Sequence, residues 1–440
     1  MLSFIHLSDI HFSKYNTNRY APDNSLRNEL LRDIRDRYVP MMREAGRETT
    51  CVLVCGDIAY SAKEEEYGEA EKFLRELCAA LEIPPFKVFC VPGNHDMDWS
   101  RTEQDSPSKN LQDSLASISV QSEFESKLGK MMSGELEKEC LFFPLSAYNK
   151  FAGQYLSGLS PEKDNALYWE SKNYSLNPLD SSVCLRLRGL NSCIISNADD
   201  HRTEVERLMR ICDAQIPNRE PGVVYMTLCH HPPECWEKWE RSEENMANKP
   251  NRRAAIQLYG HRHVHTIRTE GETSLVIGSG AAQPPRGESE WFPRYNWIQL
   301  DWNPQENAQY LTVLVFPRIY LLAAAEFAAE NEDKDYCEYQ VKIDSAKKSP
   351  SQKFSSNEEA VMLSQTALED IRKETAWNFM QLNYVTQSGI LLELNLLRNE
   401  DAGKPYVSFL MEILNRASEQ GVLESLRAKV MAQRKGDNRQ

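Results

Sequence analysis

The sequence lacks several features that would define its surroundings. It contains no run of about 18 apolar residues, the length that a membrane-spanning helix needs. The first residues show no basic region followed by a long apolar stretch, so we expect no secretory signal. None of the eleven cysteines forms a Cys-x-x-Cys pair, and several lie inside apolar runs such as 51–55. This usage indicates buried free thiols in a reducing compartment. We therefore expect a cytoplasmic protein without a membrane partner.

Basic residues are also not in surplus. The chain has 65 acidic and 51 basic residues, a formal net charge of −14. Proteins that bind a phosphate backbone over their whole surface are normally basic, so only a local basic groove would be compatible with nucleic-acid binding. The chain has 41% hydrophobic and 26% charged residues, which is typical of a folded globular protein. Its 440 residues exceed one ordinary core and predict two or three domains.

Strand and helix patterns alternate over the first hundred residues. Short apolar runs at 2–8, 51–55 and 86–91 are separated by amphipathic helical patterns at 25–45 and 64–81. This order predicts a parallel sheet covered by helices. Strand patterns resume further along, and we expect them to form a second, more antiparallel sheet packed on the first. They lie at 183–195, 223–229, 274–277, 297–302, 310–316 and 339–343.

Five short motifs rich in Asp, His and Asn follow predicted strands. Side chains at the carboxyl ends of strands converge on one edge of a sheet even when they are distant in sequence. Together the motifs offer two carboxylates, one asparagine carbonyl and four imidazoles as metal ligands, a set that suits Mn, Fe, Co, Ni or Zn better than Mg or Ca. Each motif alone is common in turns, and the metal site is indicated by their joint order. The motifs are Asp9-Ile-His11, Gly56-Asp57, Gly93-Asn94-His95-Asp96, His230-His231-Pro-Pro and Gly260-His261-Arg262-His263.

With these motifs in this order, the sequence resembles the calcineurin-like metallophosphoesterases. The likeness is to the branch with an Asp-x-His opening motif, which includes bacterial cyclic-nucleotide and glycerophosphodiester phosphodiesterases. It covers about residues 1–343 and implies an α/β fold, a four-layer αββα sandwich. It also implies two divalent metal ions, with manganese preferred and Fe, Zn, Co or Ni as alternatives. One ion would be held by Asp9, His11, Asp57 and His263, and the other by Asp57, Asn94, His230 and His261.

The resemblance further implies hydrolysis of a phosphodiester by a hydroxide that bridges the two metals. Such a pair lowers the pKa of the attacking water and binds the phosphoryl oxygens. His95 would then give a proton to the leaving alkoxide, with Asp96 as a carboxylate that orients its imidazole. His231 and Arg262 are candidate substrate contacts, although ordinary turn polarity explains them equally well. We expect Tyr60 to line the site and not to bind a metal.

The substrate class follows from departures from the phosphoprotein phosphatase pattern. Those enzymes have Gly-Asp-x-x-Asp-Arg-Gly, whereas this chain has Gly56-Asp57-Ile-Ala-Tyr-Ser, and Asp96 replaces the Glu that follows Asn-His. The leading substrate is therefore a nucleotide-type phosphodiester, either a small molecule or a nucleic-acid backbone. Candidate phosphate contacts, with solvated surface charge as the alternative, are Arg252, Arg253, Arg262 and Arg286.

Three further segments complete the organisation of the chain. Residues 100–160 are polar and helix-prone, and we expect a helical insertion that caps the site within a catalytic domain of residues 1–345. Residues 346–357 are rich in Ser and Lys and predict a linker. Residues 358–434 predict a small all-α domain of about four helices.

This C-terminal domain resembles the effector-associated, death-like adaptor domains of bacterial conflict proteins. The likeness rests on the segments 379–386, 390–397 and 409–426. It implies a protein partner bound through residues 358–434, whereas an accessory or dimerisation bundle would give the same apolar pattern. Three hypotheses remain: a phosphodiesterase with a recruiting domain, a nuclease effector of a bacterial antiviral defence system, and a non-catalytic adaptor.

Overall fold

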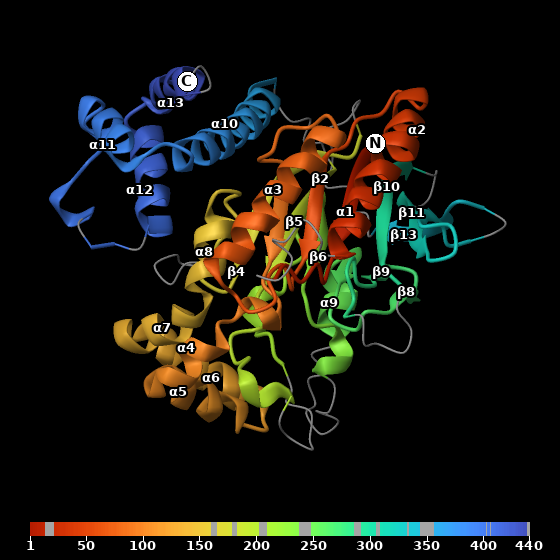
Figure 1. Cartoon of the computed structure of the whole chain (residues 1–440), viewed down its shortest axis with the longest axis horizontal. Coiled ribbons are helices and arrows are strands. Elements are labelled where there is room, and N and C mark those ends of the chain that lie inside the picture. Colours follow the sequence, from red (N-terminus) through yellow and green to blue (C-terminus); the bar gives the residue numbers. More distant parts are fainter. Residues whose placement is uncertain are drawn as a thin grey trace.

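The computed structural model describes residues 1–13, 22–159, 165–177, 183–201, 209–236, 248–285, 292–304, 309–331, 334–343, 356–401, 403–404 and 406–437. Two β-sheets lie at the centre of the molecule with helices around them (Figure 1). Their packed faces form one large hydrophobic core, in agreement with the predicted α/β sandwich. No helix among these residues is long and apolar enough to cross a membrane.

The first sheet begins with the three strands that the sequence predicts. They are β1 (Leu2–Leu7), β2 (Cys51–Cys55) and β3 (Val88–Val91), and they are mutually parallel. Every residue of β2 and β3 is buried, which explains their unbroken apolar sequences. Helices cover this sheet (Figure 1): α1 (Pro22–Asp33), a π-helical turn (Ile34–Tyr38), α2 (Val39–Glu44) and α3 (Glu64–Ala80).

Four later strands extend the first sheet, and here the expected division of strands was wrong. The antiparallel strand β10 pairs with β1 in the register Leu2↔Leu300, and β11 follows β10. β2 pairs with only one edge of β1. The backbone N–H and C=O groups of the other edge are satisfied by β10. The four strands are β10 (Arg294–Pro304), β11 (Gln309–Leu321), β12 (Glu326–Ala329) and β13 (Cys337–Ile343).

The second sheet is mostly parallel instead of antiparallel. Its order is β4-β5-β6-β7-β9-β8, in which β5, β6, β7 and β9 are parallel and the two edge strands are antiparallel. The sequence patterns missed β4, β7 and β8. The bounds are β4 (Tyr168–Ser175), β5 (Cys184–Leu190), β6 (Val223–Leu228), β7 (Ile256–Tyr259), β8 (His265–Glu270) and β9 (Ser274–Ser279).

The segment predicted as an insertion is helical throughout most of its length. Its first four helices form a group beside the sandwich, and its last helix packs beside α3 (Figure 1). The Gln112 side chain donates to the Ile194 carbonyl in the loop after β5 at 3.3 Å. The helices are α4 (Trp99–Gln104), α5 (Ser106–Ala116), α6 (Gln121–Ser133), α7 (Glu135–Phe142) and α8 (Ser146–Gly153).

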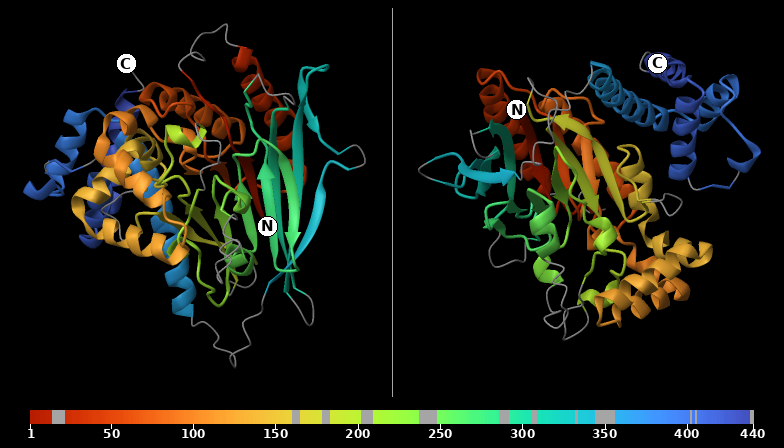
Figure 2. Two further views of the ribbon diagram at one scale, coloured as in Figure 1. Left: turned by 90° about the horizontal axis from the view of Figure 1, so that it is seen from below. Right: turned by 180° about the vertical axis from the view of Figure 1, so that it is seen from behind.

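The C-terminal segment folds into helices with a separate hydrophobic cluster. It lies at the side of the molecule opposite β10, β11 and β13 in both views of Figure 2. Its first helix also reaches the catalytic region, because Trp377 belongs to the larger core. The predicted linker falls largely outside the described residues. The helices are α10 (Ser356–Met380), α11 (Tyr384–Glu393), α12 (Tyr406–Glu419) and α13 (Leu423–Asp437).

Candidate metal centre

The five motifs meet at the carboxyl ends of strands from both sheets. The loops after β1, β2 and β3 supply the motifs at 9–11, 56–57 and 93–96. The loops after β6 and β7 supply those at 230–231 and 260–263. A backbone hydrogen bond from Gly260 to the His230 carbonyl, 3.0 Å long, joins the last two loops. The predicted convergence of these motifs is therefore found in the structure.

Several residues of the site have a positive φ, a backbone conformation that residues other than glycine rarely adopt. Of the ten non-glycine residues with positive φ in the described part of the chain, five are predicted ligands. Such conformations cost of order 1–3 kcal/mol each and persist where surrounding structure enforces them, most often at functional sites. The five are Asp9 (53°), His11 (52°), Asp57 (50°), His261 (69°) and His263 (54°).

The first group of ligand atoms consists of Asp9, His11 and His263. Nε2 of His263 lies 3.3 Å from Oδ1 of Asp9 and 3.4 Å from Nε2 of His11. All three ligand atoms lie within 4.8 Å of one another. Asp9 is held by its other oxygen, Oδ2, which accepts hydrogen bonds from the Ser8 hydroxyl and from the backbone N–H of His261.

The second group surrounds Asn94. Its side-chain oxygen lies 3.0 Å from Nε2 of His230 and 3.1 Å from Nδ1 of His261. Asp57 connects the two groups, because its Oδ2 lies 3.3 Å from Nε2 of His230 and its ligand atom also clusters with those of Asp9 and His11. Nδ1 of His230 donates to the Cys55 carbonyl at 2.8 Å, which leaves Nε2 directed at the centre.

Glycine is required at two positions beside these ligands. A Cβ on Gly93 would lie 2.0 Å from Oδ1 of Asp57, far inside contact distance. Gly56 has φ of +83°, and a Cβ there would lie 2.6 Å from Nδ1 of His230. The glycines of these motifs therefore make room for the ligand side chains.

The ionisation states of the side chains suit a metal. Burial lowers the pKa of His11 to about 4 and that of His261 to about 3, so both imidazoles are neutral at pH 7 and offer a lone pair. Burial acts to raise the pKa of Asp9, but the imidazole of His263 outweighs it and brings that pKa to about 2. Burial acts to lower the pKa of His230, and the charge of Asp57 outweighs it and raises the value to about 9. Without a metal, Asp57 and His230 thus form an ion pair, and a cation bound here would replace the proton on Nε2 of His230.

These observations fit two divalent metal ions. Among the described residues, no group donates a hydrogen bond of normal geometry to the buried Oδ1 of Asp9, although Nε2 of His263 lies 3.3 Å away, and a bound cation would satisfy this carboxylate oxygen. Four overlapping groups of His and Asp ligand atoms lie in one place, and the mixture of oxygen and nitrogen donors is that of a transition-metal site.

His95 lies next to the ligands, and its role as a proton donor stays a prediction. Its imidazole packs edge-on against His11 with ring centroids 5.0 Å apart, and its backbone N–H donates to Oδ1 of Asp57 at 2.8 Å. The group that orients its ring differs from the one expected. Nδ1 of His95 donates to the backbone carbonyl of Tyr60 at 2.8 Å.

The carboxylate of Asp96 bonds to backbone groups of two loops and not, as expected, to the imidazole of His95. Its buried carboxylate accepts hydrogen bonds from the backbone N–H groups of Ile58, Ala59 and Gly93 and from the Tyr67 hydroxyl, at 2.8–3.2 Å. Burial raises its pKa to about 6. Asp96 therefore ties the loop after β2 to the loop after β3.

The two predicted substrate contacts differ in exposure. His231 is buried, and its Nδ1 pairs with the Ser192 hydroxyl at 2.8 Å while its ring packs on His230 and His261. One of its ring nitrogens lies within 4.8 Å of those of His230 and His261, and a substrate contact by His231 stays a prediction. Arg262 is exposed between the two ligand histidines and remains a candidate.

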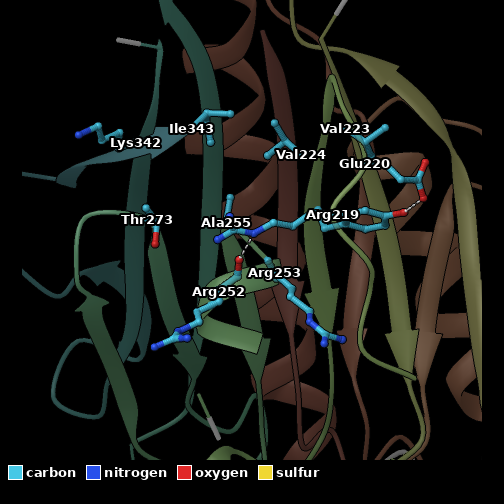
Figure 3. Close-up of a pocket in the computed structure, with 12 residues that line it drawn as sticks. Arg219, Glu220, Val223, Val224, Arg252, Arg253, Ala255, Thr273, Lys342 and Ile343 are labelled. Carbon is cyan, nitrogen blue, oxygen red and sulfur yellow. Dashed lines mark hydrogen bonds between the residues drawn. The ribbon is translucent and has the colours of Figure 1, made fainter. Parts of the chain in front are cut away.

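Arg252 and Arg253 do not lie at the expected place. They are at the end of α9 (Asn248–Arg253), before the amino end of β7, whereas the motif 260–263 follows its carboxyl end. Figure 3 shows them at a separate pocket with Arg219, and Arg253 pairs with Asp213 at 3.2 Å. The two arginines are close to the motif 260–263 in sequence, but β7 lies between them and the motif and places the two at opposite ends of the strand. Arg286 lies outside the described residues.

Several supporting groups could not be recognised from sequence. They are the Ser8 and Ser192 hydroxyls and the carbonyls of Cys55 and Tyr60. Every residue has a backbone carbonyl, so a carbonyl that supports the site cannot be recognised from the sequence. The two serines could not be recognised because their hydrogen bonds to the motifs form only in the folded chain. Ser8 alone gave a hint, since it directly precedes Asp9.

Comparisons with known proteins agree with this geometry. The model of the calcineurin-like phosphoesterase family matches residues 2–265, and the model of the GTPase-associated adaptor domain matches residues 372–432. No curated protein matches the chain.

Among solved structures, a dimetal phosphatase from Danio rerio is 12% identical with a TM-score of 0.38, covering 74% of this chain and 98% of its own. A predicted phosphoesterase from Streptococcus pneumoniae is 13% identical with a TM-score of 0.26, covering 77% and 97%. With more than half of its length matched by the family model, the chain belongs to the calcineurin-like phosphoesterase family.

Proposed function

We propose that the protein hydrolyses a phosphodiester of a nucleotide with the help of two divalent metal ions. The observation that carries the proposal is the position of Asp57 between two ligand groups, Asp9–His11–His263 and Asn94–His230–His261. A carboxylate shared by two groups of ligands is what a two-metal hydrolase requires. We propose manganese as the metal, with Fe, Zn, Co and Ni as alternatives that suit the same mixture of imidazoles and carboxylates.

Different residues of the chain have different roles in the proposed reaction. The two ions, when bound, supply Lewis acidity to the phosphoryl oxygens and lower the pKa of the attacking water. Asp9, His11 and His263 would hold one ion, Asn94, His230 and His261 would hold the other, and Asp57 would contribute to both positions. His95 gives a proton to the leaving oxygen, and the Tyr60 carbonyl keeps its imidazole in the required orientation.

The C-terminal helices serve recruitment in this proposal. The family description names an adaptor domain associated with GTPases, and we infer that a GTPase-bearing protein is the partner. A candidate contact surface lies on α11, where Tyr384 is 80%, Val385 79% and Leu392 67% exposed. Large apolar side chains grouped on one helix in this way mark interaction surfaces in many proteins.

The test compares wild type with Asp57→Ala on bis-p-nitrophenyl phosphate in the presence of Mn²⁺. The variant should lose both bound metal and turnover, whereas Asp36→Ala, at an exposed aspartate of the helix after α1, should retain both. Cyclic nucleotides, single- and double-stranded nucleic acids and p-nitrophenyl phosphate then separate a small-molecule diesterase, a nuclease and a monoesterase. Metal and turnover retained in Asp57→Ala would disprove the site.

A further inference from the structure

A half-exposed tyrosine lies beside the proposed proton donor. The side chain of Tyr60 is 50% exposed, yet its backbone is fixed on both sides. The N–H of Tyr60 donates to the Phe12 carbonyl at 2.8 Å, and the Tyr60 carbonyl accepts from Nδ1 of His95 at 2.8 Å. On the side of Tyr60 these contacts involve backbone atoms only. The hydrogen bond that orients His95 therefore does not depend on the phenol ring.

The ring of Tyr60 stacks on the imidazole of His95. The ring centroids are 5.2 Å apart and the planes differ by 25°. The centroids of the Tyr60 and His11 rings are 6.1 Å apart, and their planes differ by 71°. One face of the ring is thus covered by His95. Because half of the side chain is exposed, the other face is turned to solvent at the rim of the site. Tyr60 is not part of the hydrophobic core, so core packing does not account for an aromatic residue here.

We propose that the outward face of Tyr60 binds the nucleobase of the alcohol that leaves when the diester is cleaved. The inference rests on the proposed diesterase function. In that reaction a water oxygen bonds to phosphorus, the P–O bond to the leaving nucleoside breaks, and a proton from His95 goes to the leaving oxygen. That oxygen must lie against the imidazole of His95, and the base attached through its sugar is then beside Tyr60.

Stacking on the ring of Tyr60 determines which leaving groups are preferred. Every base has a π face, so stacking on an aromatic ring favours nucleosides in general without reading a particular sequence. A glycerol-like leaving group has no such face. Tyr60 therefore selects nucleoside leaving groups over aliphatic ones.

The experiment compares adenylyl-adenosine with bis-glycerol phosphate as substrates, in the presence of Mn²⁺. In Tyr60→Ala the ratio of kcat/KM for the two substrates should fall about 5- to 150-fold, mainly through a higher KM for adenylyl-adenosine. Tyr60→Phe should keep the ratio near that of wild type because the ring remains. Leu322→Ala, which removes another exposed apolar side chain on the β11–β12 turn, should also keep it.

Each outcome decides between the possibilities. Equal losses on both substrates in Tyr60→Ala, with a shifted pH profile, would mean that the ring only positions His95 and would overturn the proposal. A wild type that cleaves bis-glycerol phosphate but not adenylyl-adenosine would overturn it as well, while diesterase function stands. If wild type cleaves no diester, the proposed function fails. Binding of AMP then tests whether Tyr60 is a stacking site for a nucleobase. Weaker binding to Tyr60→Ala than to Tyr60→Phe supports the stacking site, and equal binding refutes it.

Discussion

At the scale of single residues, the site depends on small side chains as much as on its ligands. Gly93→Ala would place a methyl group 2.0 Å from Oδ1 of Asp57, and the carboxylate must move to relieve the contact. Displacing a catalytic group by about 1 Å can reduce the rate about 100-fold. We expect a loss of that order in metal-dependent turnover, with fewer metal ions bound per chain.

The control is Gly129→Ala in α6, where an added Cβ meets nothing within 4 Å. Alanine is favoured over glycine in a helix by about 1 kcal/mol, so this variant should be slightly more stable and fully active. Full activity in Gly93→Ala would show that the loop yields and that the close packing around Asp57 has no function.

At the scale of elements, α10 packs a charged residue against the catalytic core. The ammonium of Lys373 lies 3.2 Å from the centre of the Phe89 ring and forms no hydrogen bond with the residues that the structure describes. Burial lowers the pKa of Lys373 to about 8, while Glu369 on the same helix acts to raise it and Lys87 acts to lower it. The cost of the buried charge is only partly offset by the cation–π contact.

The pH dependence follows from this pKa. Lys373 is lowered from 10.5 to about 8, so between these values the unfolded chain binds more protons than the folded one. Stability therefore rises with pH through this window, and below it the penalty of about 3 kcal/mol is complete. Lys373→Met should raise stability towards urea at pH 7 and reduce the gain between pH 8 and 10. Lys72→Met, at an exposed lysine, should change neither. A less stable Lys373→Met would contradict this interpretation.

At the scale of the whole molecule, the adaptor helices are closely attached to the catalytic region. Asp370 pairs with Lys87 at 3.0 Å and with Lys172, and Arg75 lies over the Trp377 ring at 4.8 Å. We still propose a domain boundary between 345 and 358, because the remaining C-terminal apolar residues form a cluster of their own.

Truncation after residue 350 tests this boundary. All five motifs precede residue 264, so turnover of bis-p-nitrophenyl phosphate should persist. The melting temperature should fall, because Phe89 loses its cover and Lys87 and Lys172 lose their ion pairs. The GTPase-bearing partner should no longer bind. Asp370→Ala in the full chain should lower the melting temperature less. A truncated chain that does not fold would mean that both parts form one domain.

The sequence by itself determined the strands β1 to β3 and the residues that meet at the centre. Unbroken apolar runs of four to eight residues between turn signals favour buried strands, and ligand motifs placed directly after them are carried to the same sheet edge. These are local signals. They explain why Asp9, His11, Asp57, Asn94 and the histidines of the last two motifs could be predicted together.

Only the tertiary structure decided the features that depend on contacts across the chain. The pairing of β10 with β1 and the placement of Arg252 at the amino end of β7, away from the motifs, follow from how the sheets assemble. The same holds for the carboxylate of Asp96, which accepts backbone hydrogen bonds, and for the Tyr60 carbonyl, which orients His95. Backbone groups are identical in every residue, so their partners cannot be recognised before the fold brings them together.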